Sequence, residues 1–155
     1  MAVQAGGERG MTAASRASER QWRLLALSWL VALVSTLGAL FFSEVMELEP
    51  CVLCWYQRIA MFPLVLILGA GAYTEDAGSV KYALPLAWAG WLAAFYHCLL
   101  YGGFIPAALQ PCGKGVSCSA QKLELAGFIT IPLLSLVAFS LIVLLLLAAK
   151  KDSQP

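Results

Sequence analysis

The chain is poor in charged residues. Only 12% of its 155 residues are Asp, Glu, Lys or Arg, while 61% are hydrophobic. A soluble domain of this length needs a far more polar surface, so the composition excludes an ordinary water-soluble fold. The net charge is only +1, and nothing in it favours binding to nucleic acid. The chain also lacks an internal repeat, and its length suits a single domain.

Four long apolar segments account for the hydrophobic excess, and each contains 19 residues or more. A helix needs about 20 residues to cross the hydrocarbon core, and within lipid it pairs its own backbone groups. None of the segments has the wide polar face of a helix in a soluble bundle. The first segment exceeds the roughly 7 to 15 residues of a signal-peptide core, so we expect it to be retained. We predict an all-α integral membrane four-helix bundle with helices over 24–43, 55–73, 82–101 and 126–149.

The Lys and Arg residues are unevenly distributed between the two sides of this bundle. Seven lie in segments that share one side, and three lie on the other. Because the more basic side is normally inside, we expect both termini to be cytoplasmic, with two short outer loops. Residues 1–23 are expected to form a flexible cytoplasmic tail, 24–149 the membrane domain and 150–155 a second tail. The seven inner residues are Arg9, Arg16, Arg20, Arg23, Lys81, Lys150 and Lys151, and the three outer ones are Arg58, Lys114 and Lys122.

The first outer loop contains a Cys-Val-Leu-Cys motif, formed by Cys51 and Cys54. Pro50 favours an extended backbone just before it, so the second helix is expected to begin near this pair. The N-terminus of a helix stabilises a thiolate, which we expect at Cys54. A stabilised thiolate exchanges electrons readily, and here it would lie within reach of a lipid-soluble oxidant. The position therefore predicts an electron exit.

The second outer loop contains Cys112 and Cys118, with Gly113 and Gly115 between them. A loop with two glycines can bend far enough to close a disulfide. The segment is also the more exposed of the two, so a soluble protein could attack it. We expect an electron entry site here.

The sequence leaves two purely structural roles open for the four outer cysteines. The four outer cysteines could form two static disulfides that brace an outer cap, or a four-thiolate zinc site. A cap of two short loops offers little to brace, so we predict redox pairs and no metal. Cys98 lies within the third predicted helix and is expected to be a packing residue.

Two polar residues at membrane depth are candidate ligands for a cofactor. Arg58 follows Cys54 by four residues, which places both on one helix face about 6 Å apart along the axis. Its guanidinium could snorkel to the interface, or donate to a quinone carbonyl oxygen. His97, the single histidine, lies at a similar depth on the third helix. It could hydrogen-bond a neighbouring helix, or contact the quinone and supply a proton. The role of Gln57 is left undecided.

Residues 51–58, Cys-Val-Leu-Cys-Trp-Tyr-Gln-Arg, closely resemble the signature of the DsbB family of disulfide-bond-formation proteins. The four predicted helices, the outer position of both cysteine pairs and their order also match, over residues 24–149. The close spacing of Cys112 and Cys118, with Thr-Ile-Pro-Leu-Leu-Ser at 130–135, looks like the shorter BdbC-type branch.

The resemblance implies a thiol:quinone oxidoreductase of the cell membrane that reoxidises a thioredoxin-fold oxidase of the DsbA or BdbD kind. Such an enzyme supports disulfide bond formation in extracytoplasmic proteins, and its active cysteines face the extracytoplasmic side. Cys112 would form the mixed disulfide with the partner, Cys118 would complete the resting bridge, and Cys51 would exchange with this pair. Cys54 would lie nearest the quinone, ubiquinone or menaquinone, with Arg58 beside the ring. The short spacing between Cys112 and Cys118 leaves the details of exchange between the pairs open.

Two other functions remain as alternatives. A vitamin K epoxide reductase-like enzyme also couples cysteine pairs to a quinone, but its loop pair precedes the Cys-x-x-Cys motif, the reverse of the order here. A membrane scaffold braced by disulfides would hold no quinone and would not reoxidise its thiols when one is added.

Overall fold

A computed structural model describes residues 2–105 and 130–152, and the side chains among these from residue 19 onward. The described residues form helices and no strand. Four helices are long and apolar enough to span a membrane, which confirms the predicted four-helix architecture. The elements are α1 (Ala2–Leu40), a π-helical extension η1 (Phe41–Val45), α2 (Val52–Thr74), α3 (Ser79–Tyr101) and α4 (Ile131–Asp152).

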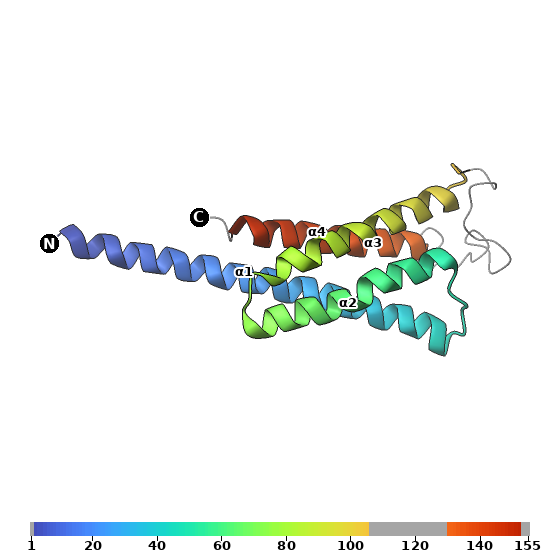
Figure 1. Ribbon diagram of the computed structural model, residues 1–155, viewed down its shortest axis with the longest axis horizontal. Coiled ribbons are helices and arrows are strands. Elements are labelled where there is room, and N and C mark those ends of the chain that lie inside the picture. The colour runs from blue at the N-terminus through green and yellow to red at the C-terminus, as the bar shows by residue number, and fades with distance from the viewer. Residues whose placement is uncertain (1, 106–129, 153–155) are drawn as a thin grey trace.

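The helices form one bundle in which each packs against two others (Figure 1). Helix α1 contacts α2 and α4, and α3 contacts the same two helices. Alanines fill much of the interior, including Ala32, Ala83, Ala87 and Ala94, while many leucines and valines face outward. Small residues let helix backbones approach closely in lipid, where large apolar side chains can remain on the outside.

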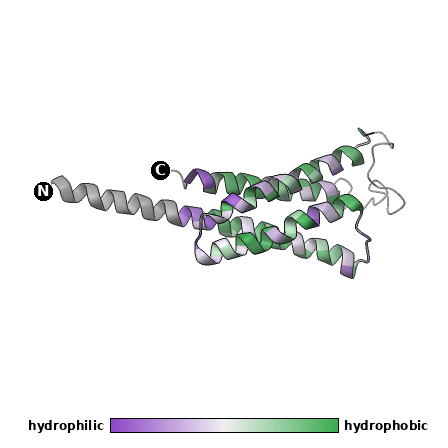
Figure 2. Cartoon of the chain, in the orientation of Figure 1, coloured by the Kyte–Doolittle hydropathy of each residue, from purple (hydrophilic) through white to green (hydrophobic). Residues whose placement is uncertain are grey.

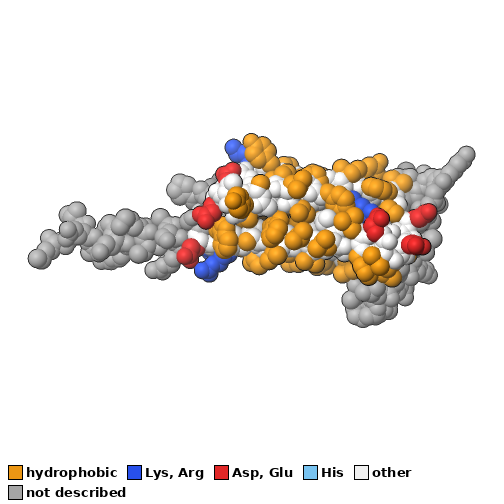
Figure 3. Space-filling view, turned by 90° about the horizontal axis from the view of Figure 1, so that it is seen from below, with side chains coloured by type: hydrophobic (Ala, Val, Ile, Leu, Met, Phe, Trp, Pro, Cys, Tyr) orange, Lys and Arg blue, Asp and Glu red, His pale blue; other side chains and the backbone are white. Residues whose placement is uncertain are grey.

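The outer surface has the pattern that a bilayer requires. Figure 2 shows hydrophobic residues along the middle of the helices and hydrophilic residues gathered near their ends. On the face shown in Figure 3, hydrophobic side chains form a broad belt, and the charged side chains lie at its two ends. This distribution matches an apolar core flanked by polar headgroups.

Several sequence predictions about boundaries need correction, including the fourth helix, which spans Ile131–Asp152 where 126–149 was expected. Residues 2–23, expected to form a flexible tail, belong to α1, and the N-terminal part of this helix projects beyond the bundle (Figure 1). The many Ala, Arg and Glu residues there are good helix formers that continue the membrane helix. Helices α2 and α3 begin at Val52 and Ser79, earlier than expected. The side chain of the N-cap residue bonds the first turn of α2, whereas the N-cap residue of α3 makes no such side-chain bond. At α3, Asp76 Oδ1 accepts the backbone N–H of Gly78 at 2.8 Å.

Close packing between α3 and α4 depends on Gly90. A Cβ at this position would collide with the ring of Phe139, which is 1% exposed. We predict that Gly90→Ala destabilises the bundle by about 1–3 kcal/mol, because the added methyl group would push the buried Phe139 ring out of its packed position. Thermal unfolding of the purified protein in detergent measures this loss. Gly38→Ala is the matched control, since its Cβ would meet nothing within 4 Å, and it should keep full stability. Equal stability of both variants would contradict the close contact.

Candidate active site

The Cys51 and Cys54 pair lies at the N-terminus of α2. Cys51 is the N-cap residue, with an extended backbone (φ −68°, ψ 168°) that follows Pro50. Its Sγ accepts the backbone N–H of Cys54 at 3.4 Å, and the two sulfur atoms lie 3.0 Å apart. Both cysteines are free thiols in the structure. The helix start therefore holds the two sulfurs within reach of each other.

The structure assigns the stabilised thiolate to Cys51, whereas the sequence led us to expect it at Cys54. A hydrogen bond from the Cys54 thiol lowers the pKa of Cys51 well below its ordinary value, and this outweighs the opposing effect of burial. Hydrogen bonds from His97 and from the Cys54 backbone N–H lower it further. The physical reason is the capping position, because only an N-cap side chain can turn back toward the unpaired N–H groups of the first turn.

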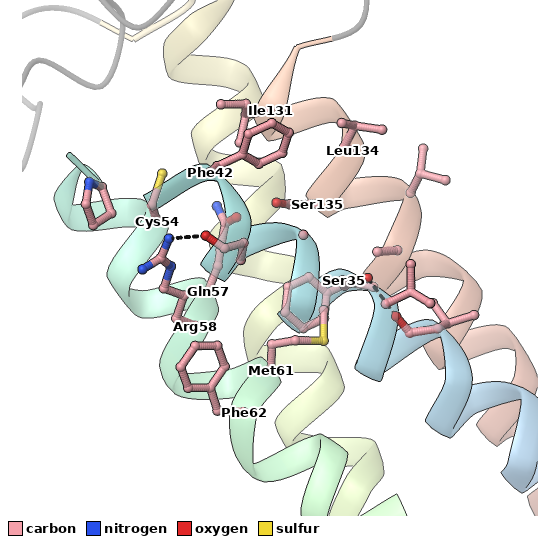
Figure 4. A pocket seen from close by; sticks show the side chains of 18 of the residues that line it. Ser35, Phe42, Cys54, Gln57, Arg58, Met61, Phe62, Ile131, Leu134 and Ser135 are labelled. Carbon is pink, nitrogen blue, oxygen red and sulfur yellow. Dashed lines mark hydrogen bonds between the residues drawn. The ribbon is translucent and has the colours of Figure 1, made fainter. Parts of the chain in front are cut away.

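A cavity of about 520 Å³ lies among α1, η1, α2 and α4. Figure 4 shows Cys54, Gln57 and Arg58 on the α2 side of this cavity, with Leu134 and Ser135 of α4 across from them. The volume is within the usual range for a site that binds a small organic molecule. Most of the lining is apolar, and it includes Leu30, Val31, Val34, Phe42, Met61, Phe62, Val137 and Phe139.

Arg58 is the one charged residue that lines this cavity among the described residues. Its Nη2 donates to the carbonyl oxygen of Ala39 at 2.7 Å, which ties α2 to α1 (Figure 4). The guanidinium carbon also lies 5.6 Å from the ring centroid of Trp55. The same side chain still has N–H donors left, since a guanidinium carries five. Arg58 is thus held in place beside Cys54 with donors to spare.

The cavity is bordered by side chains on the outer surface of the bundle. Val34 of α1 and Val137 of α4 both line it, and they are 66% and 50% exposed. These residues lie within segments long and apolar enough to span the membrane. A molecule dissolved in the lipid could therefore reach Cys54 from the side, between α1 and α4.

His97 does not line the cavity, although the sequence placed it at a similar depth to Arg58. It is 2% exposed on α3. Its Nε2 lies 3.8 Å from Cys51 Sγ, and its Nδ1 lies 3.1 Å from Nε2 of the buried Gln57. The sequence did not lead us to predict the contact between Gln57 and His97. One signal for it exists, since Gln57 follows Cys54 by three residues and so neighbours it on the helix surface.

Among the described residues, the one remaining cysteine, Cys98, is not part of this cluster. Cys112 and Cys118 lie outside the described residues, so their predicted pairing stays a prediction. Cys98 is a free, partly buried thiol on α3.

The cluster of Cys51, Cys54 and His97 also raises the question of a metal, because their ligand atoms all lie within 4.8 Å of one another. Two thiolates on tetrahedral zinc would lie about 3.8 Å apart, given Zn–S bonds of roughly 2.3 Å. The sulfurs here are closer, at 3.0 Å. That spacing favours direct chemistry between the two sulfurs.

Comparison with known proteins identifies the family of the chain. Residues 19–149 match the model of the family "Disulfide bond formation protein DsbB". A probable disulfide formation protein of Metapseudomonas resinovorans is 50% identical over 135 residues, covering 86% of this chain and 94% of the relative. Disulfide bond formation protein C of Bacillus subtilis is 47% identical over 130 residues, covering 83% and 93%. A probable disulfide formation protein of Chlamydia muridarum is 49% identical over 129 residues, also covering 83% and 93%.

No solved structure matches the chain. The family match and the relatives each span most of its length, and the matched region contains all four candidate spans apart from the last residues of α4. The chain therefore belongs to the DsbB family of disulfide bond formation proteins, and it is a multi-pass membrane protein with a role in forming disulfides.

Proposed function

We propose that the protein is a thiol:quinone oxidoreductase that reoxidises a thioredoxin-fold dithiol oxidase and passes the electrons to a membrane quinone. One observation carries this proposal: Cys54 lies on the wall of an apolar cavity, beside Arg58 and open toward the lipid. A quinone is lipid-soluble, and its ring and carbonyl oxygens suit an apolar site with one strong hydrogen-bond donor. Ubiquinone and menaquinone both meet this description.

The two cysteines of the pair have different surroundings, which supports a direction for the electrons. Cys51 is 3% exposed and contacts His97, whereas Cys54 lines the cavity. In the proposed cycle a partner dithiol reduces the Cys112–Cys118 disulfide, and this pair then reduces Cys51–Cys54 by thiol–disulfide exchange. The electrons leave through Cys54 for the quinone, which accepts two electrons and two protons. Arg58 orients the quinone ring through an N–H donor.

We further propose that the cysteines face the extracytoplasmic side of the cell membrane. The ends of α1 and α4 opposite the cysteines carry Arg20, Arg23, Lys150 and Lys151. Arg20 also pairs with Asp152 at 3.3 Å, which joins the two helices at this end. Excess positive charge marks the cytoplasmic side of a membrane protein. The side with the cysteines would then be the oxidising one, where disulfides persist.

The decisive experiment is to reduce the purified protein without oxygen, remove the reductant and add a quinone. We expect two thiols of the Cys51 and Cys54 pair to disappear for each quinone converted to quinol. Soluble analogues of ubiquinone and menaquinone would show which is preferred. A disulfide-braced scaffold predicts the opposite result, with thiols that persist after quinone is added.

A further inference from the structure

The contact between His97 and Cys51 is separate from the cavity and from the proposed quinone. His97 reaches Cys51 Sγ with Nε2, and its other ring nitrogen meets the Gln57 side chain. Both His97 and Gln57 are almost fully buried, at 2% and 6% exposure. Three side chains from two helices thus form a chain of contacts that ends at a reactive sulfur.

The Gln57 amide decides which nitrogen of His97 carries the proton. The nitrogen of an amide group can only donate, so the 3.1 Å contact with Gln57 Nε2 fits a His97 ring whose Nδ1 accepts. The neutral ring then carries its hydrogen on Nε2, which lies 3.8 Å from Cys51 Sγ. In this tautomer His97 presents a donor to Cys51, and a thiolate is the form of a cysteine that accepts hydrogen bonds best.

We propose that His97 is a catalytic residue for the exchange at Cys51, that it stabilises the Cys51 thiolate, and that Gln57 is a positioning residue that fixes its tautomer. This inference rests on the proposed function only for the identity of the final oxidant. It assigns His97 to electron entry at Cys51, whereas the sequence suggested a contact with the quinone.

The exchange needs a good leaving group at Cys51. An incoming dithiol attacks Cys51 Sγ with one thiolate, which forms a mixed disulfide and releases Cys54 as a thiolate. The second thiolate of the donor then attacks the donor sulfur of this mixed disulfide, which closes the donor's own disulfide and releases Cys51. The donor loses two electrons and the Cys51–Cys54 disulfide gains them. A hydrogen bond to the departing sulfur lowers the barrier of the last step, because a more stable thiolate leaves faster.

The other ionisable groups near Cys51 have to be considered in any measurement of its titration. From α2 these are Cys54 and, beyond it, Arg58, whose charge acts on Cys54. From α3 they are His97 and Tyr96, and Tyr96 packs against the buried cluster that contains Cys51. Glu49 precedes Cys51 by two residues. A substitution at Gln57 removes none of these ionisable side chains. It therefore tests the orientation of His97 without removing a charge near Cys51.

The test measures alkylation of Cys51 against pH in the reduced full-length protein, with the modified cysteine located by peptide mass spectrometry. For His97→Ala and for Gln57→Leu we expect the midpoint of the curve to rise by about one pH unit, since a donor to the thiolate is lost. Thiols should also appear more slowly at Cys51 when dithiothreitol reduces the oxidised protein. The KM for quinone should stay unchanged in His97→Ala, because His97 does not line the cavity.

Two further variants make the test specific. Ser140→Ala removes an unrelated hydrogen bond, which Trp91 Nε1 of α3 donates to Ser140 of α4 at 2.9 Å, and it should leave the Cys51 midpoint unchanged. His97→Gln keeps an N–H donor, so its Cys51 midpoint should lie between those of the unmutated protein and His97→Ala. A purely structural role of His97 would not explain this intermediate value. If His97→Ala leaves the Cys51 midpoint unchanged and raises the KM for quinone, the proposal is wrong and His97 contacts the quinone instead. If the unmutated protein reduces no quinone, the proposed function fails, while the alkylation curves still decide the role of His97.

Discussion

Cys54→Ser is expected to abolish electron transfer to quinone. The sulfur of Cys54 lies on the wall of the cavity, and a serine oxygen can neither form a disulfide nor carry the two electrons. Loss of a covalent group of this kind lowers turnover by at least about 1,000-fold in other enzymes, and we expect a similar loss here. The measurement is quinol formation in membranes supplied with a reduced thioredoxin-fold partner or with dithiothreitol.

Cys98→Ser is the matched control for this substitution. Cys98 is also a partly buried free thiol near one end of a helix, but it lies on α3 and does not line the cavity. Its replacement should leave the rate within about twofold of the unmutated protein, as expected for a residue outside the reaction. Persistent quinone reduction by Cys54→Ser would reject Cys54 as the electron exit. A strong loss in Cys98→Ser would instead point to a third redox cysteine.

The four helices could be predicted from sequence because the bilayer imposes a simple rule of length and hydrophobicity. The residues at which the helices begin and end were harder to predict. The start of α2 at Val52 depends on a cysteine sulfur that acts as the N-cap, and cysteine is not among the residues that usually signal a helix start. The helical N-terminal segment depends on its continuity with a long membrane helix, which composition alone does not reveal.

The candidate site could be predicted only along one helix at a time. Cys54 and Arg58 share a face of α2 because they are four residues apart, and both line the cavity as their spacing suggested. The position of His97 relative to them depends on how α3 is rotated and how it packs against α2, which a single sequence does not encode in a readable pattern. For that reason depth alone suggested a shared cavity, whereas in the structure Gln57 lines the cavity and His97 contacts Gln57 from outside it.

Arg58→Met is expected to raise the KM for quinone by about 10- to 100-fold, with a smaller effect on partner oxidation at saturating quinone. The estimate follows from losing one hydrogen bond from a charged donor to the quinone oxygen. Methionine keeps much of the apolar volume of the arginine stem, so the cavity should not collapse. Steady-state kinetics with a soluble quinone, at several concentrations, separates KM from kcat.

Arg58 also bonds the Ala39 carbonyl, so a structural contribution has to be distinguished from binding. Arg58→Lys is the conservative control, because it keeps the positive charge but loses the planar fork of donors. If Arg58 binds quinone, the lysine variant should retain part of the affinity, and the methionine variant should fold normally in a thermal unfolding assay. If Arg58 serves only to join α1 and α2, Arg58→Met should lower thermal stability and leave the KM for quinone unchanged. That second pattern would remove Arg58 from the quinone site while leaving Cys54 as the electron exit.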